Sequence, residues 1–254
     1  MSIGYQQDQG VATITIDRPE KKNAITGEMY EAIVARLKEA SADRAVRAVV
    51  ITGAGGAFTA GNDLKGFADP RFIQPDSPVL GFMQALAGFD KPVIAAVNGI
   101  AVGIGVTMLL HCDLVYAADN ATFSTPFTGL GLVPEFGSTL LFPMIAGRVR
   151  ATEALVLGKP FLAAEAVAMG IANAVLPAAE LLAHAQAVAR KFAALPPGAV
   201  RDSKKLLRQA LGNAVQETIM REASHFGPRL AGAEAREAIA AIIEKRPPDF
   251  SKFS

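Results

Sequence analysis

The order of apolar and polar positions divides the first two-thirds of the chain into alternating strands and helices. Residues 11–17, VATITID, alternate apolar and polar side chains with a period of two, which predicts a half-buried strand. Residues 27–40 place apolar side chains at helical spacing opposite charged ones, which predicts an amphipathic helix, and 46–51 predicts a second, buried strand. We expect next a loop at 53–78, a helix at 79–88, a strand at 92–97, a glycine-rich turn and helix at 99–111 and a strand at 113–117. This alternation indicates an α/β domain in which successive units stack.

The last third of the chain is predominantly helical in pattern. Alanine-rich helical segments are expected at 138–146, 150–157, 163–169, 178–194, 198–211, 213–225 and 232–244. Only NAVLP at 173–177 is typical of a strand. No tract has the low-complexity composition of a linker, so we expect the helical part to pack on the first part or on a neighbouring subunit.

Composition limits the classes of function. A chain of 254 residues with 51% hydrophobic residues can fill the core of one large domain or of two small ones. Its 25 Lys and Arg residues nearly balance its 24 Asp and Glu residues, and a net charge of +1 gives no global field that would attract nucleic acid or an anionic membrane. An anionic ligand would therefore have to be held by local contacts.

Cysteine and histidine are scarce in this chain. The single Cys112 excludes an intramolecular disulfide, and one cysteine with three histidines is too sparse for a recognisable metal cluster. The first ten residues have neither the basic nor the apolar region of a signal peptide. We therefore expect a cytoplasmic protein without a metal site.

One apolar run, 93–110, is long enough and uncharged enough to resemble a membrane span. Asn98 and Gly99 interrupt it after five residues, and Gly103 and Gly105 weaken a helix further. The run is interpreted instead as a buried strand, a turn and a short buried helix, and no membrane partner is expected.

Glycine-rich loops invite comparison with phosphate-binding motifs. GAGGAF at 53–58 lacks the spacing and the Lys-Ser/Thr pair of a P-loop, and GIGVTM at 103–108 lacks the third glycine of a dinucleotide fingerprint. The chain also contains no Gly-x-Ser-x-Gly elbow, which removes the usual esterase signature. The sequence therefore offers no nucleotide-binding or esterase motif.

Two small-residue loops have a similar build. TAGNDL at 59–64 and AVGIGV at 101–106 each follow a buried strand, and the second opens a helix. Two such loops can direct two backbone N–H groups at one point, which is the definition of an oxyanion hole, and each donor can be worth about 3 kcal/mol of transition-state stabilisation. Tight strand-to-helix packing also explains AVGIGV on its own, so the loops alone leave both interpretations open.

Longer segments carry a resemblance to a known family. Together with the two loops and the helical tail, KPVIAAVNG (91–99), CDLVYAADNATFSTPFTGLGLVPEFGS (112–138) and ATEALVLGKPFLAAEAVAMGIANAV (151–175) resemble the crotonase superfamily, the enoyl-CoA hydratases and isomerases. The resemblance covers almost the whole chain. It implies a crotonase-like (ClpP/crotonase) α/β spiral of ββα units at 1–195, a helical C-terminal trimerisation region at 196–254, and a homotrimer or dimer of trimers.

The same resemblance implies the ligand and its binding residues. The substrate would be an acyl-CoA thioester whose carbonyl oxygen lies between the backbone amides of Asn62 and Ile104. The implied substrate-binding residues are Ala60, Gly61, Asn62, Asp63, Leu64, Gly103, Ile104 and Phe127. Asp63 is expected to hold its loop in shape through backbone hydrogen bonds. Because the whole superfamily shares the oxyanion hole, it indicates the substrate class and not the reaction.

The acidic residues indicate the reaction. Hydratases of the family carry two glutamates at places that hold Thr107 and Phe127 here, and neither side chain can act as a general base at neutral pH. Glu135 follows Pro134 in TPFTGLGLVPE, a segment that, with AGNDL and AVGIGVT, resembles the peroxisomal-type Δ3,Δ2-enoyl-CoA isomerases, whose single catalytic base is the Glu of that pair. By sequence alone, a favourable interaction with a helix dipole also explains this Glu.

The resemblance thus implies an enzyme of fatty-acid β-oxidation that moves the double bond of 3-enoyl-CoA to 2-enoyl-CoA, with Glu135 carrying the proton. We expect apolar walls around Glu135 from Leu130, Leu132, Val133, Phe136 and Phe142. No cofactor is implied beyond the coenzyme A of the substrate. The alternatives are a hydratase-like or other acyl-CoA reaction and, less favoured, a non-catalytic RNA-binding member, because helix 27–40 mixes charges where a basic face would be needed.

Overall fold

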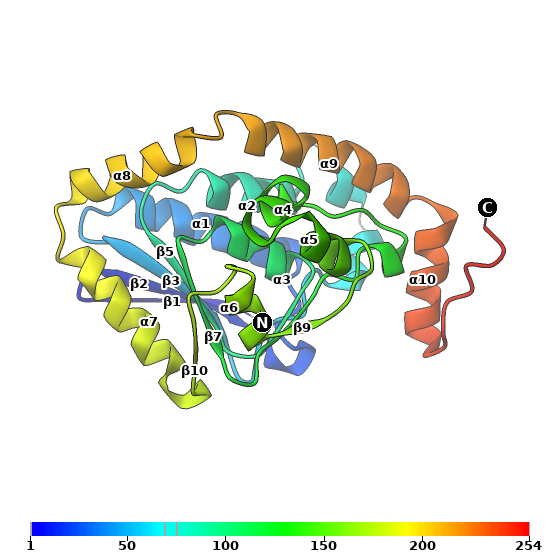
Figure 1. Ribbon diagram of the computed structural model, residues 1–254, viewed down its shortest axis with the longest axis horizontal. Helices are drawn as coiled ribbons and strands as arrows, with labels where there is room; N and C mark the ends of the chain where they lie inside the picture. Colours follow the sequence, from blue (N-terminus) through cyan, green and yellow to red (C-terminus); the bar gives the residue numbers. More distant parts are fainter. Residues whose placement is uncertain (1, 69, 75, 254) are drawn as a thin grey trace.

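Two β-sheets organise the first two-thirds of the chain in the computed structural model, which describes residues 2–68, 70–74 and 76–253 (Figure 1). Within these residues the larger sheet has the strand order β1 (Ser2–Asp8), β2 (Val11–Asp17), β3 (Ala48–Gly53), β5 (Val93–Val97), β7 (Leu114–Ala118) and β10 (Ala174–Leu176). The smaller sheet has the order β4 (Ala57–Thr59), β6 (Ile100–Val102), β8 (Thr122–Ser124) and β9 (Phe161–Leu162). Neighbouring strands are parallel except in the pairs β1–β2 and β8–β9.

The strands follow a repeating order along the chain. Each of β3, β5 and β7 in the larger sheet is followed by a short strand, β4, β6 or β8, in the smaller sheet. Helix α2 (Pro78–Ala87) closes the first of these units and α3 (Ile104–Thr107) closes the second. The predicted stacking of α/β units is therefore confirmed, and it takes the form of strand–strand–helix units.

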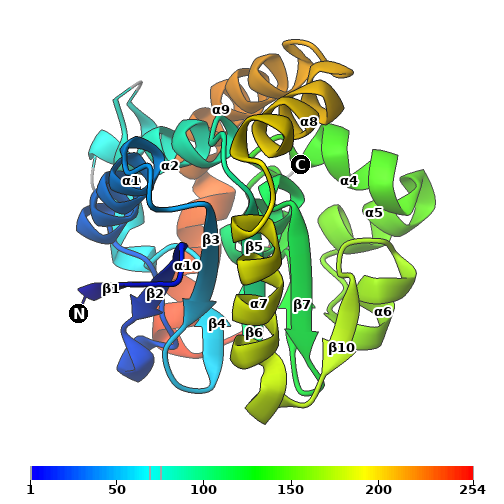
Figure 2. The ribbon, with the colours of Figure 1, turned by 90° about the vertical axis from the view of Figure 1, so that its left-hand side faces the viewer.

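Helices cover both faces of the larger sheet. On one side, α1 (Gly27–Ala42) packs against α2 and the first strands. Thr26 caps the N-terminus of α1, because its hydroxyl accepts a hydrogen bond from the Met29 amide. On the other side, α7 (Ala178–Ala193) crosses β3, β5 and β7 (Figure 2).

The remaining α-helices of the described residues are α4 (Ser138–Ala146), α5 (Arg148–Leu155), α6 (Ala163–Ala168), α8 (Pro197–Gln209), α9 (Ala214–Leu230) and α10 (Ala233–Glu244). Short 3-10 helices lie at Pro19–Lys21, Leu64–Ala68, Pro70–Ile73, Met108–His111 and Thr128–Leu130.

The apolar run 93–110 contains two strands. β5 is completely buried, Asn98 and Gly99 form the predicted turn, and β6 and α3 follow. The Asn98 side chain donates to the carbonyls of Gly53 and Gly55, while a Cβ at Gly99 would lie 2.1 Å from the Gly56 carbonyl oxygen. Among residues 2–68, 70–74 and 76–253, no helix has the length and apolar character needed to cross a bilayer.

The sequence patterns did not reveal the short strands or the first strand. β4, β6 and β8 have three residues each, which is too few to show a period, and the stretch from 53 to 78 was expected to be a loop. β1 is largely exposed and polar, and it pairs with β2 through a turn in which Gln9 and Gly10 both have positive φ. Its formation depends on the neighbouring strand and not on its own apolar pattern.

Candidate active site

The loops that follow β4 and β6 lie directly against each other. A Cβ at Gly61 would lie 2.6 Å from the carbonyl oxygen of Val102, and a Cβ at Gly105 would lie 2.6 Å from Cγ2 of Thr59. Gly61 also has a φ of +84°, which favours glycine. The small residues are thus required by the contact between the two loops, which fixes their relative position.

Two residues of these loops, Asn62 and Ile104, line a common cavity. Ile104 is the first residue of α3, so its N–H has no partner within the helix. Asn62 forms a parallel β-bridge with Ile25, in which the Ile25 amide donates to the Gly61 carbonyl and the Asp63 amide donates to the Ile25 carbonyl. The N–H of Asn62 itself takes no part in this bridge. Among the residues that the structure describes, neither N–H has an acceptor, and both residues line a cavity of about 480 Å³. The same cavity is lined by Ala60, Gly61, Asp63, Leu64, Gly103 and Phe127.

An ion pair holds the loop that carries Asn62. The Arg18 guanidinium donates to the Asp63 carboxylate at 2.5 Å and to the carbonyl of Ala24 at 3.1 Å, and both side chains of the ion pair are largely buried. Asp63 thus acts through its side chain as well as through its backbone amide, which donates to Ile25. The sequence does not indicate this role of Arg18, because the segment RPEKKNA (18–24) has the pattern of an ordinary polar loop.

The side chain of Asn62 is also occupied. The hydroxyl of Tyr30, on α1, donates to Oδ1 of Asn62 at 2.6 Å. Burial raises the pKa of Tyr30 well above its ordinary value, and the nearby charge of Glu135 raises it further. Tyr30 therefore remains a hydrogen-bond donor and orients Asn62, which lines the first cavity.

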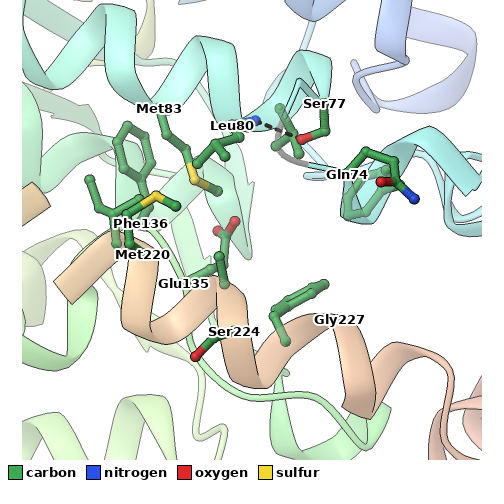
Figure 3. Close-up of a pocket in the computed structure, with 14 residues that line it drawn as sticks. Gln74, Ser77, Leu80, Met83, Glu135, Phe136, Met220, Ser224 and Gly227 are labelled. Atoms are coloured by element: carbon green, nitrogen blue, oxygen red, sulfur yellow. Dashed lines mark hydrogen bonds between the residues drawn. The ribbon is translucent and has the colours of Figure 1, made fainter. Parts of the chain in front are cut away.

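Glu135 points into a second cavity, of about 240 Å³, between α2 and α9 (Figure 3). Its apolar walls come from α2, from α9 and from Phe136, and include Val79, Leu80, Met83, Ile219, Met220 and Phe226. The expected walls were only partly right. Leu130 and Leu132 line the first cavity, whereas Val133 and the buried Phe142 line neither of the two. Local sequence could not indicate α9, which comes from the last quarter of the chain.

Burial of Glu135 changes its acidity. The residue is 5% exposed, and burial raises the pKa of its carboxyl to about 8. A hydrogen bond from the Thr107 hydroxyl to Oε1, at 3.0 Å, acts in the opposite direction, and the charge of Glu222 raises the pKa further. A carboxyl with this pKa can both accept and return a proton near neutral pH. Thr107 stands where hydratases of the family carry a glutamate and is the last residue of AVGIGVT, and in the structure it contacts Glu135 directly.

The turn after Glu135 has an unusual backbone. Phe136 has a φ of +62°, a conformation that is strained for a bulky residue. The His111 ring stacks on the Phe136 ring with 4.0 Å between centroids, and Nε2 of His111 donates to the Phe136 carbonyl at 2.7 Å. Burial lowers the pKa of His111 to about 4, so it is neutral at physiological pH. His111 is buried, and these two contacts support the turn.

The two cavities are neighbours. Phe226 of α9 lines both of them, and its ring packs against the rings of Phe67 and Phe72. The structure therefore gathers the proposed amide donors and Phe127 around one cavity and places Glu135 in the adjoining one. Within the described part of the chain, no three His, Cys, Asp or Glu side chains gather as a metal site requires.

Comparison with known proteins identifies the family. The family described as enoyl-CoA hydratase/isomerase matches residues 6–252. The chain is 38% identical to enoyl-CoA delta isomerase 2 of Rattus norvegicus over 94% of this chain and 62% of that protein, so it spans less than two-thirds of that relative. It is 36% identical to 1,2-epoxyphenylacetyl-CoA isomerase of Escherichia coli K12, with 96% of each chain covered.

A solved structure agrees with these matches. The crystal structure of an enoyl-CoA hydratase/isomerase from Pseudoalteromonas atlantica T6c superposes with a TM-score of 0.94 at 40% identity, covering 98% of this chain and 100% of that one. The fold of strand–strand–helix units and the match over almost the full sequence lead to one conclusion. The chain belongs to the enoyl-CoA hydratase/isomerase family of the crotonase superfamily.

Proposed function

We propose that this protein is a Δ3,Δ2-enoyl-CoA isomerase, which moves the double bond of a 3-enoyl-CoA to the 2-position during fatty-acid β-oxidation. One observation carries the proposal. Among the residues that the structure describes, Glu135 is the only carboxylate lining the apolar cavity next to the two free amides. A single carboxylate suits this reaction, because one proton leaves C2, one arrives at C4, and the substrate gains or loses no atoms.

The first step uses both cavities. The thioester carbonyl oxygen accepts hydrogen bonds from the amides of Asn62 and Ile104, and the acyl chain runs past Phe226 toward Glu135. The Glu135 carboxylate takes a proton from C2, the C2–H electron pair spreads into a dienolate, and the negative charge on the thioester oxygen is stabilised by the two amides. Each amide can contribute about 3 kcal/mol to this transition state.

The second step returns the proton. Neutral Glu135 donates to C4, the dienolate collapses to the conjugated 2-enoyl thioester, and the carboxylate is regenerated. The raised pKa of Glu135, about 8, makes it a stronger base than an exposed carboxylate and still lets it hold the proton between the steps. Coenzyme A enters as part of the substrate, and the proposed steps use no metal and no redox cofactor.

Hydration is the competing reaction within the family. It requires that a water molecule be activated and that C2 be protonated. Hydratases of the family use two glutamates for these steps, and this chain has Thr107 and Phe127 at the two positions. The Thr107 hydroxyl already donates a hydrogen bond to Glu135, and Phe127 is buried in the wall of the first cavity. These contacts support isomerisation over hydration.

The proposal is tested by supplying the purified protein separately with a 3-enoyl-CoA and a 2-enoyl-CoA, and by following the products by chromatography and NMR. We expect the first to be converted to the 2-enoyl-CoA and the second to gain water slowly or not at all. Rapid hydration of the 2-enoyl-CoA without isomerisation of the 3-enoyl-CoA would contradict the proposal.

A further inference from the structure

A second buried carboxylate lies behind Glu135 and takes no part in the proposed chemistry. Glu222, on α9, is 5% exposed and does not line either of the two cavities described above. Its Oε2 accepts from the amide of Gly137 at 2.6 Å, and its Oε1 accepts from the amide and the hydroxyl of Thr139 at 2.8 and 2.6 Å. Both carboxylate oxygens are thus committed to the segment that directly follows Glu135.

Helix α4 lacks an acceptor of its own at its start. Its N-cap residue is Gly137, which has no side chain and a φ of +71°, so the first amides of the helix need acceptors from elsewhere. The amide of Ser138 donates to the carbonyl of Glu135, and Glu222, on α9, supplies the acceptor for the amide of Thr139. A negative charge at this position is also favoured by the dipole of α4.

The turn from Glu135 to Gly137 is therefore held from two sides. His111 donates to the carbonyl of Phe136, and Glu222 accepts from the amide of Gly137. Phe136, between them, has the strained positive φ. A strained turn persists only where contacts from the surrounding structure hold it in place. This turn determines how Glu135 enters the cavity.

Helix α9 has two roles at this site. Ile219, Met220, Ala223 and Phe226 form one wall of the cavity into which Glu135 points. Glu222, on the same helix, holds the turn that carries Glu135. The wall that would contact the acyl chain and the support of the proposed base are thus parts of one rigid element.

We propose that Glu222 is a positioning residue, which fixes the direction of the Glu135 carboxylate by holding the Gly137–Thr139 segment. This inference rests on the proposed role of Glu135 as the catalytic base. Positioning of this kind affects turnover more than substrate binding, since a reacting group displaced by about 1 Å can lose roughly 100-fold in rate.

Glu222 also has an electrostatic effect on Glu135. Three groups face Glu135: Tyr30 from α1, Thr107 from α3 and Glu222 from α9. His111 is neutral, and the positive charge of Arg221 partly offsets the negative charge of Glu222. Burial raises the pKa of Glu222 itself, against the three hydrogen bonds that lower it. Replacing Glu222 by a neutral residue removes a negative charge near Glu135, so the pKa of Glu135 falls.

The test compares Glu222→Gln with Glu217→Gln, the same substitution at an exposed position of α9, and with Glu135→Gln. Glu222→Gln keeps the side-chain size, but the NH2 group that replaces one carboxylate oxygen cannot accept a hydrogen bond from a backbone amide. We expect kcat on 3-enoyl-CoA to fall roughly 10- to 100-fold with KM nearly unchanged, and the rising limb of the pH–rate profile to move to lower pH. Glu217→Gln should behave like the wild type.

The outcomes separate the two proposals. If Glu135→Gln is inactive but Glu222→Gln keeps the wild-type kcat and pH limb, the positioning role is wrong and the proposed function stands. A loss of thermal stability without a change in kcat or pH limb would also reject positioning. Full activity of Glu135→Gln would overturn both proposals.

A second pair of variants covers the case in which Glu222→Gln does not fold. Thr139→Val removes one of the three donors to Glu222 and leaves both carboxylates in place. We expect a smaller loss of kcat, of several-fold, and its recovery in Thr139→Ser, which restores the hydroxyl. Equal, wild-type turnover in both variants would count against the proposal.

Discussion

At the scale of single residues, Glu135 is held where its charge is unfavourable for the fold. The carboxyl is buried between α2 and α9, and among the described residues it accepts a hydrogen bond only from the Thr107 hydroxyl. Burial raises its pKa to about 8, which means that the fold favours the neutral form. The feature that would make Glu135 an effective base therefore costs stability, and the two effects can be measured separately.

The stability effect has a defined pH window. The pKa of Glu135 is raised in the folded state from an ordinary value of 4.5, so the unfolded chain releases the proton first and the wild type loses stability between about pH 4.5 and 8. Glu135→Gln has no proton to release. We expect equal melting temperatures near pH 4 and a higher melting temperature for the variant at pH 9, measured by calorimetry. Parallel curves for the two proteins across this range would show that the pKa is not raised.

Thr107 offers a direct test of the pH dependence of turnover. The wild-type kcat/KM should rise with pH through the pKa of Glu135, since only the carboxylate can accept a proton. Thr107→Val removes the hydrogen bond that lowers this pKa, so the rising limb moves to higher pH and the rate at pH 7 falls roughly tenfold. Thr107→Ser keeps the hydroxyl and serves as the control. An unshifted rising limb of the pH–rate profile in Thr107→Val would show that Thr107 does not lower the pKa of Glu135.

At the scale of the elements, the sequence predicted the long segments well and the contacts between them poorly. Helices expected at 138–146 and 178–194 occur at Ser138–Ala146 and Ala178–Ala193, because long periodic segments carry a strong signal. Three-residue strands have no such signal. The roles of Arg18, Tyr30 and Glu222 could not be predicted either, since each contacts a partner at least 32 residues away in sequence.

The loop that carries Asn62 provides a prediction at this scale. Arg18→Met removes the buried cation that holds Asp63, which should lower the free energy of unfolding by about 3 kcal/mol and let the Asn62 amide move. Since one misplaced amide can forfeit about 3 kcal/mol of transition-state stabilisation, kcat should fall by roughly 100-fold. Urea titration and steady-state kinetics measure the two effects.

A matched control for this loop is Lys22→Met, because the Lys22 side chain is exposed and lies three residues before Ile25. This variant should retain the stability and turnover of the wild type. If Arg18→Met were as active as Lys22→Met, the loop would not depend on the ion pair.

At the scale of the whole molecule, α8, α9 and α10 run along the outside of the two-sheet core (Figure 1). Several of their apolar side chains are exposed, among them Leu206 at 68%, Leu207 at 80% and Ile243 at 74%. Exposed apolar groups of this size often mark interaction surfaces. The fold class was predicted from the resemblance and is confirmed, whereas the assembly of the chain stays a prediction.

We propose that the chain assembles through this helical region into a trimer or a dimer of trimers. Sedimentation equilibrium should give the mass of three or six chains of 26.5 kDa. Replacing Leu206 and Leu207 together by lysine should shift the protein toward lower mass without unfolding it. A wild-type protein that sediments as a monomer at micromolar concentration would contradict the assembly.

The central claim is that Glu135 carries the proton between C2 and C4 while the amides of Asn62 and Ile104 hold the thioester. The most direct test is the turnover of a 3-enoyl-CoA by Glu135→Gln, with binding of the same thioester measured by calorimetry. We predict that isomerisation falls by at least 1,000-fold, a loss within the 10²–10⁴-fold range of a positioned acid–base group, while the dissociation constant changes little. Near-normal turnover by this variant would show that another group is the base.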